Sequence, residues 1–455
     1  MNKLQAGFSR VNINPPMGTP INGYFKLRHV EGYLDDLEVC ALALRVEDTT
    51  TVMLSMDICL ISTPLALELR QKIAEAAKLP LEAIWIHTTH THDGPHIGPL
   101  ASVASLEFPE QETLLAEYYA FFSRRLVDAT TLALADLKDA KMGWAVGQAP
   151  NISFVRRFRM KDGKVRTNPG VGNPDILHPI GDVDERVNVL RFDRANDSLV
   201  LVNFGCHPDT VGGSLISADW PGFTRRRLEK ALDNVKCIFF NGAEGDVNHV
   251  NVNATKGDFN DMFNDFDDVA RGYGHARHMG NVVAGAVLQV YDKVNYEDVD
   301  SLRFLQKTAK LPSNMPNPED LPLARKYNEL HEAGRDEEIP FKGMELTTVV
   351  ADARRKLRLE HGPETFDLNL SGIALGNISM IGIPGEPFTG IGRGLKEAEG
   401  WAMVMPMCLV NGNQGYFPMK DAYDEGGYEA RASNYKAGTA EQIIVEGVEL
   451  LNKLR

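Results

Sequence analysis

The residues AIWIHTTHTHDGP, at positions 83–95, join an apolar stretch to a cluster of histidines and threonines. The first six are mostly apolar, β-branched or aromatic and predict a buried strand over 83–88. Polar residues come directly where that strand ends. The same order, an apolar strand and then a polar turn, recurs along the chain, and strand ends are where ligands bind in α/β proteins.

Strands and helices alternate on both sides of this stretch. Apolar runs at 36–46 and 51–60, separated by polar residues, predict a hairpin. A helix is predicted to begin at Thr63-Pro64, because Thr can cap free N–H groups and Pro suits the first helical position. Further strands are predicted at 141–148, 187–193, 198–204, 235–240 and 366–383, and further helices at 111–137, 221–233, 266–291 and 438–453. The alternation predicts an α/β fold, with a mixed β-sheet covered by helices on both faces.

The composition is that of a soluble globular protein and excludes several classes. Of the 455 residues, 43% are hydrophobic and 24% charged, and the formal net charge is −14. Nucleic acid and anionic membranes are therefore not expected as partners. No apolar run reaches the ~18 residues of a membrane span and residues 1–12 lack a signal-peptide core, so we expect a cytoplasmic protein. The five cysteines are scattered, which predicts reduced core residues rather than disulfides.

Two histidines, His90 and His92, lie two residues apart after the strand 83–88. On an extended backbone both rings project to the same side, with Cα atoms about 6–7 Å apart. That spacing suits two ligands of one metal, or one ligand and one substrate contact, although histidine-rich loops also cap strands. His87 and His96 lie outside this pair and are expected to be structural.

Two more strand ends carry polar residues. His207 follows the strand 198–204, and its neighbour Cys206 is expected to pack in the core. The loop FNGAEGDVNH, at 240–249, follows the strand 235–240. Its glycines, Gly242 and Gly245, would let the backbone approach a ligand and present N–H groups to an oxyanion, although a tight polar turn also explains them.

A carboxylate and several phenols follow the later strands. Glu386, in IPGEP at 383–387, comes where a strand ends and a helix begins, so it is either a functional carboxylate or a helix cap. Tyr416, Tyr423 and Tyr428 follow in turn. Tyrosines near strand ends more often pack than take part in chemistry.

In this order, the five segments resemble the catalytic domain of the neutral ceramidases and their bacterial relatives. The resemblance extends from Gly7-Phe8-Ser9 to Tyr428-Glu429-Ala430 and includes the THTH-x-GP segment and the EGDV loop at 244–247. It implies an amide hydrolase that uses one Zn²⁺ ion held by two histidines, a glutamate and a tyrosine. Carried over by motif, the zinc ligands are His90, His207, Glu386 and Tyr416. Such nitrogen and oxygen donors, with one open position, suit a zinc ion that activates water.

The resemblance also assigns catalytic roles to residues that do not bind the metal. His92 would act as a proton shuttle or hydrogen-bond donor, and Tyr428 would stabilise the oxyanion. Arg156 lies where the relatives have a substrate-binding arginine, although the pair Arg156-Arg157 leaves the register open by one residue.

Two residues depart from the family pattern. Asn248 replaces the serine that follows the EGDV loop, and because Asn cannot attack a carbonyl, metal-activated water must be the nucleophile while Asn248 donates a hydrogen bond. Asp93 replaces the serine after THTH. It would raise the basicity of the ligand histidines or contact a polar substrate, and it argues against a purely lipid pocket.

These observations predict a zinc-dependent hydrolase that cleaves a carbon–nitrogen bond of a small soluble substrate. An ester or lactone hydrolase on the same scaffold stays open, as does a catalytically silent zinc-binding relative. A metallophosphatase would normally need a second metal. The oligomeric state stays open.

Ligand candidates from residue 90 to residue 416 require almost the whole chain to fold as one unit. We therefore expect one catalytic domain over 1–455, with an insertion at 293–345, where charge and proline interrupt the apolar pattern. The stretch 258–268 carries apolar residues at helical spacing, which predicts a helix packed on the domain or, alternatively, a lid over the site: Phe259, Met262, Phe263 and Phe266.

Overall fold

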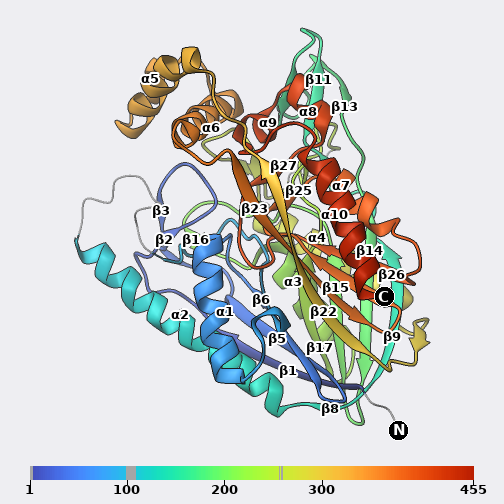
Figure 1. Ribbon diagram of the computed structural model, residues 1–455. Coiled ribbons are helices and arrows are strands. Elements are labelled where there is room, and N and C mark those ends of the chain that lie inside the picture. The colour runs from blue at the N-terminus through green and yellow to red at the C-terminus, as the bar shows by residue number, and fades with distance from the viewer. Residues whose placement is uncertain (1–3, 99–108, 256, 258–259) are drawn as a thin grey trace.

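Three β-sheets carry the fold in the computed structural model, which describes residues 4–98, 109–255, 257 and 260–455 (Figure 1). The first sheet contains β7 (Ile84–Thr88), β6 (Thr49–Met56), β5 (Glu38–Val46), β1 (Leu4–Asn12) and β8 (Lys138–Asp139). The second contains β17 (Val235–Asn241), β15 (Ser198–Phe204), β14 (Arg186–Asp193), β9 (Lys141–Gln148) and β21 (Asn295–Glu297). The third contains β22 (Leu302–Pro312), β23 (Thr365–Leu375), β24 (Ile378–Gly382) and β26 (Met403–Met407). The predicted α/β class with mixed pairing is confirmed.

Each sheet contains one parallel pair of strands joined by a crossover helix. The pairs are β6–β7, β15–β17 and β24–β26. Their connecting helices are α1 (Thr63–Ala77), α3 (Asp219–Ala231) and α7 (Thr389–Lys396). Because the crossover helix returns the chain to the end of the sheet where the first strand began, both strands of each pair run in the same direction and end on the same side. The polar turns therefore gather there.

The inner faces of the three sheets meet in one shared core. In β5, the alternate residues Cys40, Leu42 and Leu44 pack in this core with Phe240 of the second sheet and Met380 of the third. The intervening residues of β5 face the other way, toward α1 and α2 (Pro109–Ala135). Strands buried on both faces explain why their sequences read as continuous apolar runs.

Helices cover the outer face of each sheet. α1 and α2 lie on the first sheet, α3 and α4 (Tyr273–Tyr291) on the second, and α7 and α10 (Thr439–Leu454) on the third (Figure 1). The cap of α1 lies one residue earlier than predicted: Ser62, not Thr63, caps the helix, and its side chain accepts the N–H of Leu65. Among the described helices, none combines the length and apolarity that crossing a membrane demands.

Short elements connect the sheets around the polar strand ends. The paired short strands are β2 (Pro20–Ile21) with β3 (Arg28–His29), β4 (Gly32–Tyr33) with β16 (Leu215–Ile216), β10 (Phe154–Val155) with β18 (Val247–Asn248), and β25 (Glu386–Pro387) with β27 (Tyr416–Phe417). A further small sheet contains β12 (Val165–Thr167), β11 (Arg157–Met160) and β13 (Ile176–Pro179). The short helices α8 (Lys420–Glu425) and α9 (Tyr428–Ala432) complete this end.

The predicted helix over 258–268 is wrong for its described residues, 260–268. They form turns and the strand β19 (Phe263–Asn264), which pairs with β20 (Ala270–Arg271), so α4 starts well after residue 266. The Asp265 side chain accepts the N–H of Phe266, and Asp268 has a φ of 63°. Such local hydrogen bonding competes with helix formation. Phe263 and Phe266 stay 47% and 36% exposed, so no packed apolar face forms here.

The segment 293–345 begins within the sheets, because β21 belongs to the second sheet and β22 to the third. β22 pairs with β23 along its full length, and only the residues after it leave the sheet. They form α5 (Leu321–Glu332) and the start of α6 (Gly343–Leu359), which project at the upper left of Figure 1. The insertion and the single-domain boundary stay predictions.

A buried ion pair joins the first sheet to α3. The Arg225 guanidinium donates to both carboxylate oxygens of Asp57, at 2.9 and 2.5 Å, and both side chains are at most 2% exposed. Asp57 also accepts the hydroxyl of Thr89 at 3.4 Å, next to His90. The pair therefore ties the first histidine loop to the second sheet's helix.

We expect Asp57→Asn to lower the free energy of unfolding by about 3 kcal/mol, because it leaves the buried Arg225 guanidinium with only the partly buried Glu38, 3.4 Å away, as a counter-charge. Urea titration of the metal-free protein measures this change. The control is Glu68→Gln, which removes the half-exposed pair with Lys72 and should cost about 0.5 kcal/mol or less. A loss below about 1 kcal/mol for Asp57→Asn would show that the pair does not hold the two layers together.

Candidate metal centre

Residues from four strand ends meet on one side of the three sheets. His90 follows β7, His207 follows β15, and Glu386 and Tyr416 begin the short strands that follow β24 and β26. Parallel pairing of β25 with β27 sets Glu386 directly opposite Tyr416. The structure therefore brings together the four residues that the resemblance assigned to zinc.

Two imidazole nitrogens and one carboxylate oxygen face a common point. The Nε2 atoms of His90 and His207 are 3.2 Å apart. Oε2 of Glu386 lies 3.5 Å from the first and 3.6 Å from the second. Ligands at about 2.0–2.1 Å from a tetrahedral zinc would be about 3.3 Å apart, so these separations fit such an ion.

The hydrogen bonds of the two rings leave lone pairs at this point. Nδ1 of His90 lies 2.9 Å from the carbonyl oxygen of Cys59, and Nδ1 of His207 lies 3.0 Å from that of Glu244. A carbonyl only accepts, so we assign the ring proton to Nδ1 and a lone pair to Nε2. Oε2 of Glu386 has no hydrogen-bond partner in the described chain. Three buried acceptors facing one another repel unless a cation lies between them.

The surrounding charges also favour a cation. Burial lowers the pKa of His90, but Cys59, Glu386 and Glu244 outweigh it and raise that pKa well above its usual value. Burial raises the pKa of Glu386, but His90 and then His207 outweigh it and bring that pKa to about 2. The raised pKa of His90 marks negative potential at that ring, as a metal ion needs, whereas the lowered pKa of Glu386 means that its carboxylate is ionised, as a metal ligand must be.

His90 reaches this position through an unusual backbone. Its φ is 73°, in the left-handed region, so the extended backbone assumed for His90 and His92 is wrong. The two rings still converge, with Nε2 atoms 3.3 Å apart. Non-glycine residues in this conformation cost free energy and cluster at functional sites. The N–H of His90 donates to the carbonyl of Ile58, which helps to hold the strained turn.

Aromatic rings and one arginine extend the site beyond the donors. The Tyr416 ring lies nearly parallel to His207, with centroids 6.4 Å apart, and Tyr428 meets it edge-on at 5.6 Å. The Arg156 guanidinium lies 5.5 Å from the Tyr416 ring. It donates to Glu429 at 2.6 Å and to the Gly245 carbonyl at 2.8 Å. These contacts fix Arg156 rigidly beside the donors.

The structure resolves the register of the arginine pair. Arg156 lines the same cavity as the donors, whereas Arg157 donates to Glu425 and to the Gly426 carbonyl outside it. Neighbours on a strand point to opposite faces, so only one of the two can reach the site.

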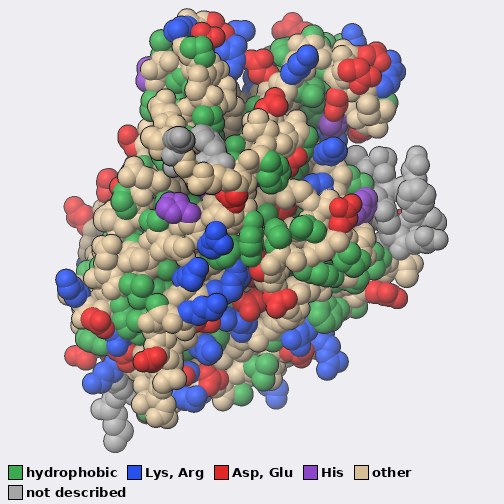
Figure 2. Space-filling model, turned by 180° about the vertical axis from the view of Figure 1, so that it is seen from behind, with side chains coloured by type: hydrophobic (Ala, Val, Ile, Leu, Met, Phe, Trp, Pro, Cys, Tyr) green, Lys and Arg blue, Asp and Glu red, His purple; other side chains and the backbone are tan. Residues whose placement is uncertain are grey.

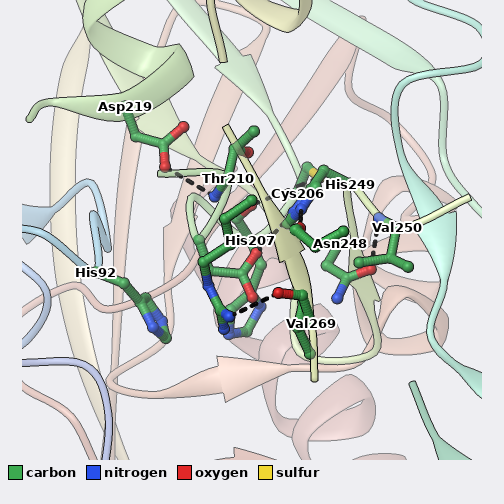
Figure 3. Close-up of polar contacts among 12 residues, drawn as sticks. His92, Cys206, His207, Thr210, Asp219, Asn248, His249, Val250 and Val269 are labelled. Carbon is green, nitrogen blue, oxygen red and sulfur yellow. Dashed lines mark hydrogen bonds and ion pairs between the residues drawn. The ribbon is translucent and has the colours of Figure 1, made fainter. Parts of the chain in front are cut away.

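Asn248 and Asp93 lie away from the cavity surface. The amide of Asn248 donates to Asn168 at 3.1 Å and accepts the N–H of Val250, toward which it points in Figure 3. Asn168, not Asn248, lines the cavity. Asp93 accepts from Arg28 at 2.7 Å, and burial, partly offset by Arg28, raises its pKa to about 6. The ligand histidines are instead oriented by the carbonyls of Cys59 and Glu244.

The glycines of the 240–249 loop serve close packing rather than ligand contact. The N–H of Gly242 donates to Phe204 and that of Gly245 donates to Pro387, so neither is available to an oxyanion. A Cβ at Gly245 would lie 2.5 Å from the carbonyl oxygen of Glu386. Glycine at this position lets the loop pack directly against β25.

Several residues of the site had no assigned role in the sequence. Cys59 and Glu244 orient the two ligand rings, and Asp209 accepts from His249 at 3.1 Å behind them. His92 and His207 lie on neighbouring elements near this pair (Figure 3). Asp209 and Glu244 lie in the polar loops at strand ends, and this position could have marked them as residues of the site. Cys59 lies in an apolar segment, where the sequence gives no such signal. His87 is structural, bonded to Ser55 and to the N–H of Asn241.

A cavity of about 360 Å³ lies over the donors. Besides His90, His92, His207 and Glu386, its walls include Asn22, Tyr24, Phe25, Leu27, Leu60, His96, Arg156, Asn168, Asp209, Phe266, Asp267, Arg271, Met344, Arg354 and Tyr428. A second cavity, of about 700 Å³, shares Asn168, Asp267 and Met344 with the first. It opens between the two projections at the top of Figure 2. The donors therefore lie at the end of a recess with both polar and apolar walls.

The fold and the donor cluster define an α/β protein with a candidate metal centre at its strand ends. No model of a known protein family matches the sequence, and no curated protein sequence is similar to it. Among solved structures, the chain is similar to neutral ceramidase from Pseudomonas aeruginosa, with a TM-score of 0.70, 16% identity, and coverage of all of this chain and 75% of that one. A ceramidase complexed with C2 gives a TM-score of 0.68, 15% identity, and coverage of 100% and 76%. The chain therefore has a neutral ceramidase-like fold.

We expect the protein to bind one divalent ion, and His207→Ala to weaken that binding by more than about 100-fold, because it removes a donor and not merely an orienting group. Competition with a chromophoric chelator measures the affinity. The exposed His178, replaced by Ala, is the control and should leave the affinity unchanged. Equal affinities for the wild type and His207→Ala would place the ion elsewhere.

Proposed function

We propose that this protein is a zinc-dependent hydrolase that cleaves the amide bond of a small soluble substrate. The observation that carries the proposal is the convergence of the Nε2 atoms of His90 and His207 with Oε2 of Glu386 on the wall of a cavity. The similarity to two structures named as ceramidases supports amide hydrolysis as the reaction.

His90, His207 and Glu386 would hold the ion, with Tyr416 as the fourth ligand. The donor set is made of nitrogen and oxygen atoms, which suits zinc in a catalytic site. When bound, Zn²⁺ lowers the pKa of a water in its open position to near 7 and polarises a carbonyl. Glu386 is buried, and its Oε2 has no hydrogen-bond partner among the described residues, so this oxygen is free to serve as a ligand.

His92 is placed to move a proton. Its Nε2 is 3.3 Å from that of His90, and its Nδ1 has no hydrogen-bond partner among the described residues. Burial, and then the charge of His90, hold the pKa of His92 well below its usual value. The imidazole is therefore neutral at pH 7 and can accept a proton from water and pass it to the leaving amine.

Tyr428 and Arg156 are placed to stabilise negative charge on the carbonyl oxygen. Burial raises the pKa of Tyr428 far above its usual value, so its phenol keeps its proton and can donate a hydrogen bond. Arg156 is held by Glu429 and by the Gly245 carbonyl, so it needs no reorganisation when the charge develops.

The reaction adds one water across the amide bond. The water oxygen bonds to the carbonyl carbon, the carbon–nitrogen bond breaks, and the nitrogen gains one proton. The products are a carboxylic acid and an amine. An ester or lactone would react with the same residues, so its hydrolysis is the second candidate.

The cavity favours a small substrate with polar groups. Its volume of about 360 Å³ holds roughly a dozen water-sized groups, at ~30 Å³ each. Charged residues of both signs, among them Arg156, Asp209 and Arg271, line its wall. A long acyl chain would gain less from burial here than in an apolar pocket, because charged side chains form part of the wall.

We expect Tyr428→Phe to lower kcat about 100- to 1,000-fold on the best amide of an N-acyl panel while metal content stays at one ion per chain, because one oxyanion donor is lost. The control is Tyr423→Phe, which loses a hydrogen bond to Ser433 at 3.1 Å and lies outside the cavity. Glu386→Gln should lose both metal and turnover.

Steady-state kinetics and elemental analysis of the same preparations check these outcomes. A protein that holds zinc yet hydrolyses no amide, ester or lactone would be a silent zinc-binding relative. Two ions per chain would favour a metallophosphatase. Unchanged turnover by Glu386→Gln would refute the proposed centre.

A further inference from the structure

Arg354 stands out among the charged residues of the catalytic cavity. It lies on α6, in the part of the chain that leaves the third sheet after β22, and its partly buried side chain lines the cavity. Its guanidinium carbon is 5.3 Å from the centre of the Phe25 ring. That ring in turn meets the Tyr428 ring edge-on at 6.4 Å. The guanidinium is thus separated from the proposed oxyanion residue by one aromatic ring.

The other two arginines of the cavity are neutralised by carboxylates. Arg156 is paired with Glu429 at 2.6 Å, and Arg271 with Asp267 at 2.8 Å. Arg354 has neither a side-chain hydrogen bond nor an ion pair within 4.0 Å in the described part of the chain. Burial lowers its pKa, while the more distant Glu332 and Asp336 raise it. A guanidinium stays protonated in proteins, so this wall holds a positive charge that no carboxylate of the described chain pairs with directly.

A carboxylate is the group that such a position matches. A guanidinium presents parallel N–H donors that fit both oxygens of a carboxylate. The single guanidinium without a directly paired carboxylate on this wall suits a singly charged group better than a phosphate, which carries about two negative charges at pH 7. The same wall offers the apolar side chains of Phe25, Phe266 and Leu27, against which a hydrophobic group next to the carboxylate can pack.

We propose that the Arg354 guanidinium binds the carboxylate of the substrate, and that the substrates are N-acyl amino acids with an apolar side chain. In this arrangement the scissile carbonyl faces Tyr428, the apolar side chain packs on the Phe25 wall, and the α-carboxylate reaches Arg354. The inference rests on the proposed amide hydrolysis but concerns a separate group of the cavity. Arg354 lies away from the reacting atoms, so it acts mainly on substrate binding.

Three compounds and three variants test the inference. N-acetyl-L-phenylalanine carries the carboxylate on the amine side, N-acetyl-2-phenylethylamine lacks it, and N-succinyl-2-phenylethylamine carries it on the acyl side. The variants are Arg354→Ala, Arg354→Lys and the control Arg358→Ala. Arg358 lies one turn further along α6, is exposed, and bonds Asn434 outside the cavity.

We expect the wild type to favour N-acetyl-L-phenylalanine over N-acetyl-2-phenylethylamine by about 10- to 100-fold in kcat/KM, as charge-assisted hydrogen bonds supply. Arg354→Ala should remove this preference through KM and leave the neutral compound within about 2-fold. Arg354→Lys should keep part of the preference, because lysine retains the positive charge but lacks the parallel N–H donors of the guanidinium. Arg358→Ala should behave as the wild type.

Each negative result would refute a different part of the proposal. Preference for the neutral compound, or an equal loss on all three compounds in Arg354→Ala, overturns the carboxylate site while amide hydrolysis stands. Preference for the N-succinyl compound places the carboxylate on the acyl side and refutes N-acyl amino acids. If no compound is hydrolysed, calorimetry measures binding instead. Binding of N-acetyl-L-phenylalanine that depends on Arg354 would support the carboxylate site and refute the hydrolase. Equal binding of the neutral compound would refute the carboxylate site.

Discussion

Three atoms with lone pairs, two imidazole nitrogens and one carboxylate oxygen, lie within 3.6 Å of one another in the interior, and much of the structure exists to hold them there. Each is fixed from behind. The carbonyls of Cys59 and Glu244 orient the rings of His90 and His207, and pairing of β25 with β27 fixes Glu386. Without such support the donors would turn away from one another toward water, since mutual repulsion favours separation.

The support comes from repeating one topological unit in three sheets. Each sheet has a parallel pair joined by a helix, and each pair sends its carboxyl ends to the same side. The first supplies His90, the second His207 and the Glu244 carbonyl, and the third Glu386 and Tyr416. Because the sheets share one core, the site can move only if the packing of that core changes.

Much of the fold and the donor set could be predicted from the sequence, because both depend on local patterns. Apolar runs mark strands buried on both faces, and polar residues directly after them mark the strand ends. The pairing of His90 with His92 was predicted for the wrong reason, since a left-handed residue and not an extended backbone brings the rings together. A short-range pattern gives the residue types and spacing, but not the backbone conformation that tertiary contacts impose.

What could not be predicted depends on contacts between distant segments. The carbonyl of Cys59 has no side-chain signature, and Asn168 takes the cavity position expected for Asn248 only because β10 and β18 pair. The predicted helix does not form over the described residues 260–268, because aspartate side chains accept backbone N–H groups of nearby residues there, which apolar periodicity does not reveal. Arg354 lies in a stretch for which the sequence predicted no functional site, and only the fold brings it to the cavity.

The rigid sheets and the segments outside them supply different groups to the cavity. The donors and Arg156 lie at strand ends that three sheets hold rigidly, which suits groups whose positions must be exact to a fraction of an ångström. Phe25, Phe266 and Arg354 come from loops and from α6, outside the three parallel pairs. Changes there can alter the substrate without disturbing the candidate metal centre. Conversely, the donors converge only in the folded chain, so an ion that binds them would contribute directly to folding stability. The centre therefore constrains the sheets, while the outer wall stays free to set specificity.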